Sequence, residues 1–203
     1  FKWYACSAGI SLSALLYPLR IFIEYNTAEG PLNRFSGLLE FTAIISTVHC
    51  LYGFSFSYLG VDSRRYHPVA GACHGLVLIL LWFTDLVVAE RFVSRDFTGL
   101  DSPYIEPALG PLGPLFVLYA AIASIAVVVI WVKHRSTYSK DWIAYLAGVG
   151  FWVVLGIHDG MVALGASTSQ YVMEYGFLGF SMVVLRGRAP QPCSDIFALG
   201  VIG

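Results

Sequence analysis

The chain has 203 residues, of which 57% are hydrophobic and only 12% are charged, and its mean hydropathy is +0.70. Soluble domains carry about 25% charged residues, so this composition excludes an ordinary soluble domain and predicts a protein embedded in a membrane. The net charge of -1 provides no basic field for nucleic acid, which is therefore not an expected partner.

Six apolar stretches reach the length of about 20 residues that a helix needs to cross a bilayer. They are too long for strands and lack sustained alternation, and a chain in lipid must satisfy its own backbone hydrogen bonds. We therefore predict an all-α membrane protein, a polytopic helical bundle within residues 1–186, followed by a cytoplasmic tail of unassigned structure at residues 187–203. The six predicted spanning helices are residues 3–25, 35–60, 69–90, 115–132, 142–164 and 168–185.

Basic residues gather in the connections on one side of this predicted bundle. The 61–68 connection contains two arginines, and the 133–141 connection contains two lysines and an arginine. Cytoplasmic connections are enriched in Lys and Arg, so this side is predicted to face the cytoplasm, together with both ends of the chain. Eight of the twelve basic residues lie there: Lys2, Arg64, Arg65, Lys133, Arg135, Lys140, Arg186 and Arg188.

The connection at residues 91–114, RFVSRDFTGLDSPYIEPALGPLGP, is unusually long and falls on the outer side. Connections longer than about 12 to 15 residues are uncommon in compact domains and are often functional. Two interpretations remain open from the sequence: a functional lid or entry loop, and a tethering loop with an interfacial turn.

Ionisable residues from five predicted helices lie at about the same depth, near the outer side of the membrane. At about 1.5 Å of rise per residue, Asp159, Asp85 and Glu40 each lie about 8 Å from the outer ends of their helices. A charge at the bilayer centre costs about 2.5 to 3.5 kcal/mol, so such groups normally face the bundle interior and pair. We predict an outward-facing polar pocket; the alternative is that these groups only satisfy one another and fix helix packing. The candidate ligand-binding residues are Asp159, His158, Glu174, Asp85, Glu40 and Arg20, with Tyr171 and Tyr175 as candidate walls.

Histidine and cysteine neighbours in the second and third predicted helices resemble a metal or haem ligand set: His49 with Cys50, and Cys73 with His74. On the predicted boundaries, however, His49 lies about 16 Å from the inner end of its helix and His74 about 8 Å from that of its own. This mismatch in depth argues against shared coordination, so no metal site is predicted.

Catalytic signatures are missing from the sequence. The three lysines lie outside the mid-membrane region, which leaves no amine for a retinal Schiff base. The GxSxG, HExxH, CxxC and phosphate-loop patterns do not occur. The chain is therefore predicted not to be an enzyme and to hold no cofactor.

The last third of the chain carries a recognisable pattern in IHDGMVALGASTSQYVMEYGFLGFSMVVL, residues 157–185. The polar pair His158 and Asp159 near the outer end of one helix is followed by Gly165, and the final helix contains Tyr175, Gly176 and Phe177. This pattern resembles the closing helices of bacterial seven-transmembrane sensor regions, the membrane input modules of histidine kinases, diguanylate cyclases and related signalling proteins. The resemblance implies seven helices, so a first helix is expected upstream of Phe1.

The resemblance implies a sensory input region of a bacterial inner-membrane signalling protein. Such a region senses a small ligand or ion at its outer face and relays the signal to a cytoplasmic output domain, here absent from the chain. The expected partners are the lipid bilayer, the ligand, this output domain and a second copy of the chain. The alternative is a small permease or an ion- or proton-coupled transporter that uses the same carboxylates; a third is a scaffold whose acids only pack helices.

Overall fold

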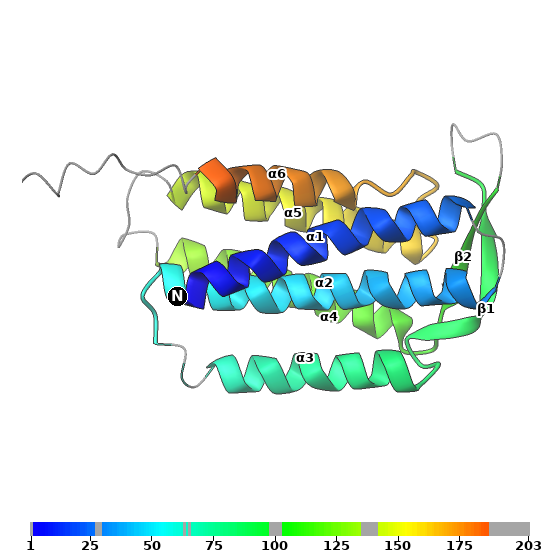
Figure 1. Ribbon diagram of the computed structural model, residues 1–203, viewed down its shortest axis with the longest axis horizontal. Coiled ribbons are helices and arrows are strands. Elements are labelled where there is room, and N and C mark those ends of the chain that lie inside the picture. Colours follow the sequence, from blue (N-terminus) through cyan, green and yellow to red (C-terminus); the bar gives the residue numbers. More distant parts are fainter. Residues whose placement is uncertain are drawn as a thin grey trace, which may run out of the picture.

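The computed structural model describes residues 2–26, 30–62, 64, 66–97, 103–134 and 142–186. The predicted tail at 187–203 and much of the basic 133–141 connection lie outside these residues. Six helices lie side by side in the described part, and a two-stranded sheet covers one end of the bundle (Figure 1). The elements are α1 (Lys2–Asn26), α2 (Pro31–Tyr58), α3 (Tyr66–Phe83), β1 (Val88–Arg95), β2 (Tyr104–Leu109), α4 (Gly113–Lys133), α5 (Trp142–Ala163) and α6 (Met173–Arg186).

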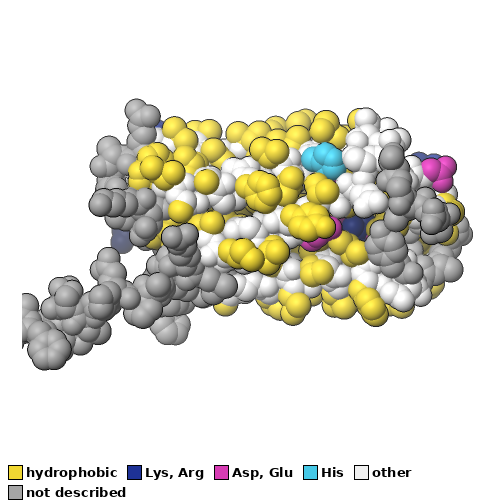
Figure 2. Space-filling view, turned by 90° about the horizontal axis from the view of Figure 1, so that it is seen from above, with side chains coloured by type: hydrophobic (Ala, Val, Ile, Leu, Met, Phe, Trp, Pro, Cys, Tyr) yellow, Lys and Arg dark blue, Asp and Glu magenta, His cyan; other side chains and the backbone are white. Residues whose placement is uncertain are grey.

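Four of the helices, α2, α3, α4 and α5, are long and apolar enough to cross a membrane. Hydrophobic side chains extend along the bundle, while the Asp, Glu and His side chains visible on one long face lie in the half that carries the sheet (Figure 2). These features support a membrane protein. Six spans are not shown among the described residues: α6, for example, has 14 described residues from Met173, about 21 Å of helix against the about 30 Å of a hydrocarbon core.

The prediction that the third helix runs to residue 90 is wrong, and so is the all-helical class for this part of the chain. α3 ends at Phe83, and β1 pairs with β2 as an antiparallel hairpin. Both strands are rich in residues that favour extended structure, such as Val93 and Tyr104. Backbone hydrogen bonds between the two strands replace the internal hydrogen bonds of the helix that was expected to continue to residue 90.

The hairpin is held against α2 by close backbone approach. Gly37 faces Pro107 of β2, and a Cβ at Gly37 would lie 3.0 Å from the Pro107 Cγ. The Asn33 side chain donates a hydrogen bond to the carbonyl of Ile105 at 3.1 Å. Alternate residues of β2 are buried, which turns Tyr104 and Glu106 toward the helices. The hairpin thus supplies two polar side chains to the end of the bundle.

The opposite half of the bundle contains an aromatic core. The rings of Trp131 in α4 and Tyr58 in α2 stack at 5.3 Å, and Tyr145 of α5 lies 5.6 Å from Trp131. The Trp131 indole donates to the Ser55 hydroxyl at 2.8 Å, so its one polar group is satisfied. This core packs the helices together, and the buried charged groups are concentrated at the hairpin end.

Candidate ligand-binding site

A buried arginine lies at the centre of the hairpin end of the bundle. Arg20 of α1 is 2% exposed, and its Nε donates to Glu24 at 2.8 Å. Its Nη2 lies 3.3 Å from an oxygen of Glu40 in α2 and 4.0 Å from an oxygen of Glu106 in β2. Carboxylates from three elements therefore converge on one guanidinium, the pairing expected of charges inside a membrane protein.

Three tyrosine rings surround the same guanidinium. The Arg20 Cζ lies 5.9 Å from the ring centroid of Tyr17, 6.0 Å from Tyr104 and 5.2 Å from Tyr171, all within cation–π range. The Tyr171 hydroxyl donates to Glu106 at 2.8 Å. Burial, followed by the nearby Glu106 carboxylate, raises the pKa of Tyr171 well above its usual value, so the hydroxyl stays protonated and acts as a donor.

Asp159 connects the end of α5 to the start of α6. Its carboxylate accepts hydrogen bonds from the backbone N–H of Val172 at 2.9 Å and of Met173 at 2.8 Å, and from the Tyr17 hydroxyl at 3.2 Å. A carboxylate that binds the first amides of a helix is favoured by hydrogen bonding and by the helix dipole. The acid in the apolar α5 therefore fixes the N-terminus of α6.

The loop between α5 and α6 is ordered by local hydrogen bonds. Gly165 has a φ of 75°, and its N–H bonds to the carbonyl of Val162 at 2.8 Å, while the N–H of Ala166 bonds to Met161 at 2.8 Å. These two bonds are a Schellman motif, in which a left-handed residue, usually Gly, ends the helix. His158 extends the network through Nε2, which lies 2.8 Å from the Ser169 hydroxyl.

Arg95 of β1 ties the hairpin to the end of α5. Its side chain forms an ion pair with Glu106 and donates to the carbonyl of Ala163 at 2.6 Å. The hairpin, the end of α5 and the start of α6 therefore share one polar network.

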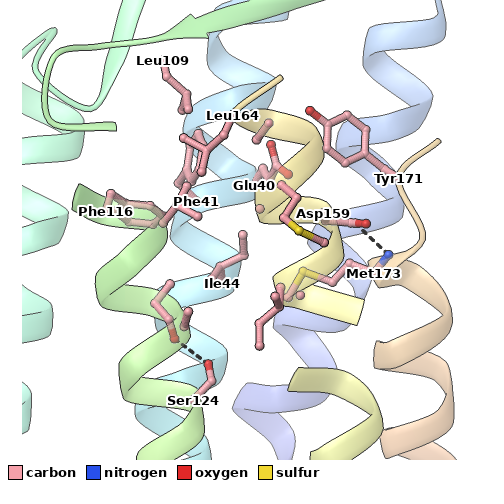
Figure 3. A pocket seen from close by; sticks show the side chains of 18 of the residues that line it. Glu40, Phe41, Ile44, Leu109, Phe116, Ser124, Asp159, Leu164, Tyr171 and Met173 are labelled. Atoms are coloured by element: carbon pink, nitrogen blue, oxygen red, sulfur yellow. Dashed lines mark hydrogen bonds between the residues drawn. The ribbon is translucent and has the colours of Figure 1, made fainter. Parts of the chain in front are cut away.

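A cavity of about 270 Å³ opens beside this network (Figure 3). Glu40, Asp159 and Tyr171 lie at its polar side, and Phe41 and Phe116 belong to its apolar wall. An apolar cavity with a few convergent polar groups is typical of small-molecule sites. The other wall residues come mainly from α2, α4 and α5 and include Ile44, Leu118, Ala121, Trp152, Ile157, Met161, Leu164 and Met173.

The structure brings together half of the predicted ligand-binding residues. Arg20, Glu40 and Asp159 all line the cavity, and the predicted wall residue Tyr171 does so as well. His158 is in contact with Asp159, with its Nδ1 2.9 Å from the carboxylate, but is not part of the wall.

The remaining predicted residues lie elsewhere. Asp85 follows the end of α3 instead of lying within a helix; its side chain is 56% exposed and pairs with Arg34. Its predicted depth was wrong because the helix ends before it. Glu174 borders a smaller hollow beside Tyr171, and Tyr175 is 60% exposed.

Several polar residues of the site were missed from the sequence. Glu24 lies four residues after Arg20, a spacing that places two side chains on one helix face and could have revealed the pair. Tyr104 and Glu106 alternate along a strand, but the segment was interpreted as a loop. The place of Arg95 in the site could not be predicted from the sequence, because it depends on the hairpin.

The depth argument that separated His49 from His74 was also wrong. Their Nδ1 atoms lie 3.0 Å apart. Because α2 ends at Tyr58 and α3 begins at Tyr66, both histidines are about 12 to 14 Å from the connection between the helices. Even so, the described residues contain no group of three His, Cys, Asp or Glu side chains that could hold a metal ion.

Comparisons with known proteins add no family. No protein-family model matches the chain, and no curated protein or solved structure shows a significant match. The function is therefore argued from the site alone.

Proposed function

We propose that the chain is the sensory input region of a bacterial membrane signalling protein, in which the cavity binds a small ligand and α6 carries the response. The observation that supports this function is the position of Asp159, which lines the cavity and also binds the first amides of α6. Met173, the first residue of α6, and Tyr171, two residues before it, also line the cavity. Occupancy of the cavity and the position of α6 are therefore coupled through shared residues.

The size of this coupling follows from the hydrogen bonds of Asp159. A ligand shifts a conformational equilibrium only by its difference in affinity for the two states. Hydrogen bonds to charged groups contribute about 1.5 to 3 kcal/mol, and about 1.4 kcal/mol corresponds to a tenfold change in an equilibrium. A ligand that alters one of the hydrogen bonds from Asp159 to Val172 or Met173 would thus change the ratio between the two conformations of the start of α6 at least tenfold.

The proposal keeps the orientation inferred from the basic connections. The hairpin end then faces outward, and the far end of α6 faces the cytoplasm, where an output domain would receive the change. It also keeps the resemblance of residues 157–185 to bacterial seven-transmembrane sensor regions.

The transporter alternative receives less support from the geometry. A carrier of cations or protons needs carboxylate oxygens that are free to bind its cargo. Asp159 is held by two backbone amides and Tyr17, and Glu106 is held by Arg95 and Tyr171. These two acids act within the fold, which leaves Glu40 as the acid of the cavity that a carrier would use.

The experiment compares two variants of α4 in the full chain, reconstituted into lipid nanodiscs. Ala121→Leu adds three carbon atoms inside the cavity wall, whereas Ala126→Leu adds the same atoms at a half-buried position outside it. We expect Ala121→Leu to change amide hydrogen exchange at residues 171–175 at least fivefold, and Ala126→Leu to leave it unchanged. Equal exchange in both variants would contradict the coupling.

A flux assay separates the sensor from the transporter. Liposomes that contain the wild-type chain and a pH-sensitive dye are given a proton or sodium gradient. The sensor proposal predicts a leak no faster than that of empty liposomes. A saturable flux that Glu40→Gln abolishes would replace the proposal with the transporter.

A further inference from the structure

Two buried donors at the wall of the cavity lack a partner. Among the described residues, none accepts a hydrogen bond from Nη1 of Arg20 or from Nε1 of Trp152. Both residues line the cavity, and each is 2% exposed. A buried donor without a partner costs about 1 to 3 kcal/mol. A ligand acceptor that reaches the Arg20 guanidinium would remove the cost at that residue.

Glu40 is the complementary acceptor. The described residues give its carboxylate no donor other than Arg20 Nη2, at 3.3 Å, although a carboxylate can accept about four hydrogen bonds. Its side chain is 11% exposed and reaches the cavity (Figure 3). By contrast, Glu24 is held by Arg20 and also by the Ser36 hydroxyl at 2.9 Å. Glu40 is therefore the acid that has room for a donor from the ligand.

The charges around the cavity disfavour an ionic head group. A carboxylate head would be repelled, because the acids of the cluster outnumber the arginines. An ammonium head would meet Arg20 and could not accept a hydrogen bond from it, since an ammonium has donors only. A hydroxyl head donates once and accepts twice, so it can serve Glu40 and Arg20 together. The acids of the cluster are Glu24, Glu40, Glu106 and Asp159, and its arginines are Arg20 and Arg95.

The mouth of the cavity carries exposed apolar side chains. Leu118 of α4, Ile157 and Met161 of α5, and Leu164 just after α5 line the cavity and are 39% to 55% exposed. They lie on or beside helices that are long and apolar enough to span a membrane. An apolar mouth between spanning helices faces the acyl chains of lipid, so a ligand with an aliphatic body can enter from the bilayer.

The size of the cavity limits the ligand. Its volume of about 270 Å³ is about nine times the 30 Å³ that a water molecule occupies in the liquid. About nine or ten heavy atoms fit, which corresponds to a hydroxyl head with eight or nine carbons inside the cavity, so the end of a ten-carbon chain reaches the mouth.

We infer that this site, if it is the ligand site of the proposed sensor, binds an uncharged amphiphile whose hydroxyl head meets Arg20 and Glu40 and whose aliphatic chain extends to the mouth between α4 and α5. Only the statement that the protein uses this site for sensing rests on the proposed function. The preference for a hydroxyl over a carboxylate rests on the excess of acids, and the preference over an ammonium rests on the unpaired donor of Arg20.

The test uses three probes with the same ten-carbon chain: 1-decanol, decanoate and decylamine. Each is titrated into the full chain in lipid nanodiscs, and binding is followed by the thermal unfolding midpoint and by tryptophan fluorescence. We expect 1-decanol to raise the midpoint saturably, and both ionic probes to bind at least tenfold more weakly. Equal binding of all three probes would overturn the inference, because it would report partitioning into lipid and not a head-group site.

Variants locate the binding and test its charge dependence. Ala121→Leu should weaken 1-decanol binding at least tenfold, and Ala126→Leu, the matched control on the same helix, should bind as the wild type does. Glu40→Gln removes one negative charge while keeping the shape of the side chain. It should therefore reduce the difference in affinity between decanoate and 1-decanol at least fivefold. An unchanged difference in a folded Glu40→Gln protein would contradict the assigned role of Glu40.

The outcomes separate the ligand class from the sensor function. If 1-decanol binds in the cavity without changing exchange at residues 171–175, the ligand class stands and the sensor proposal fails. If 1-decanol does not bind while Ala121→Leu still changes that exchange, the sensor proposal stands and the ligand class is wrong.

Discussion

Replacement of Asp159 by Ala should loosen the start of α6 without unfolding the bundle. The carboxylate accepts from three donors, the half-buried amide of Val172, the buried amide of Met173 and the buried hydroxyl of Tyr17. Each buried donor that loses its partner costs about 1 to 3 kcal/mol. Even at about 1 kcal/mol for each donor, the total of about 3 kcal/mol corresponds to roughly a hundredfold rise in local opening.

Hydrogen exchange measures this opening directly, because amides exchange through local unfolding of the segment that protects them. In Asp159→Ala, the amides of Val172 and Met173 should exchange roughly a hundredfold faster, while the amides in the middle of α2 and α4 keep their wild-type rates. Asp159→Asn, which retains one acceptor oxygen, should show a smaller increase. Asp85→Ala is the matched control, because this half-exposed acid pairs with Arg34 and surface pairs contribute only about 0 to 1 kcal/mol. Exchange at Val172 and Met173 within twofold of wild type in Asp159→Ala would refute the reasoning.

Three further substitutions test other parts of the structure. Arg20→Met leaves the surrounding carboxylates without their shared partner and should lower the free energy of unfolding by about 3 to 5 kcal/mol. Denaturant titration in detergent micelles measures this loss. A loss below about 1 kcal/mol would show that the ion cluster does not stabilise the fold. Gly37→Val would place a side chain against Pro107, so amide exchange in β1 and β2 should rise while that of α4 does not; unaltered strands would mean that this contact does not hold the hairpin. Gly165→Ala should cost about 1 kcal/mol of stability, because the φ of 75° disfavours a side chain, and an equally stable variant would contradict the left-handed turn.

The helical part of the fold was predictable because apolar runs of about 20 residues have few alternatives in lipid. α2, α4 and α5 begin and end within a few residues of their predicted limits. The convergence of Arg20, Glu40 and Asp159 was also predictable, because charges in spanning helices avoid lipid and seek one another.

The hairpin could not be predicted in the same way. A long apolar run conceals the point where a helix ends, so Asp85 was placed inside α3 although the helix ends at Phe83. Short strands of six and eight residues give a weak periodic signal, and Glu106 joins Arg20 only after the hairpin folds back over the bundle. The capping of α6 by Asp159 depends on the path of the loop, and the spacing of 13 residues between Asp159 and Val172 does not reveal it.

A double-mutant cycle between Ala121→Leu and Asp159→Ala tests the link between cavity and α6 most directly. Amide exchange at residues 173–176 is measured in the wild type, both single variants and the double variant, all in lipid nanodiscs. We predict that filling the cavity changes this exchange only while Asp159 is present, which gives a coupling free energy of about 1 kcal/mol or more. If Ala121→Leu has the same effect with and without Asp159, the acid is not the link between the ligand site and the final helix.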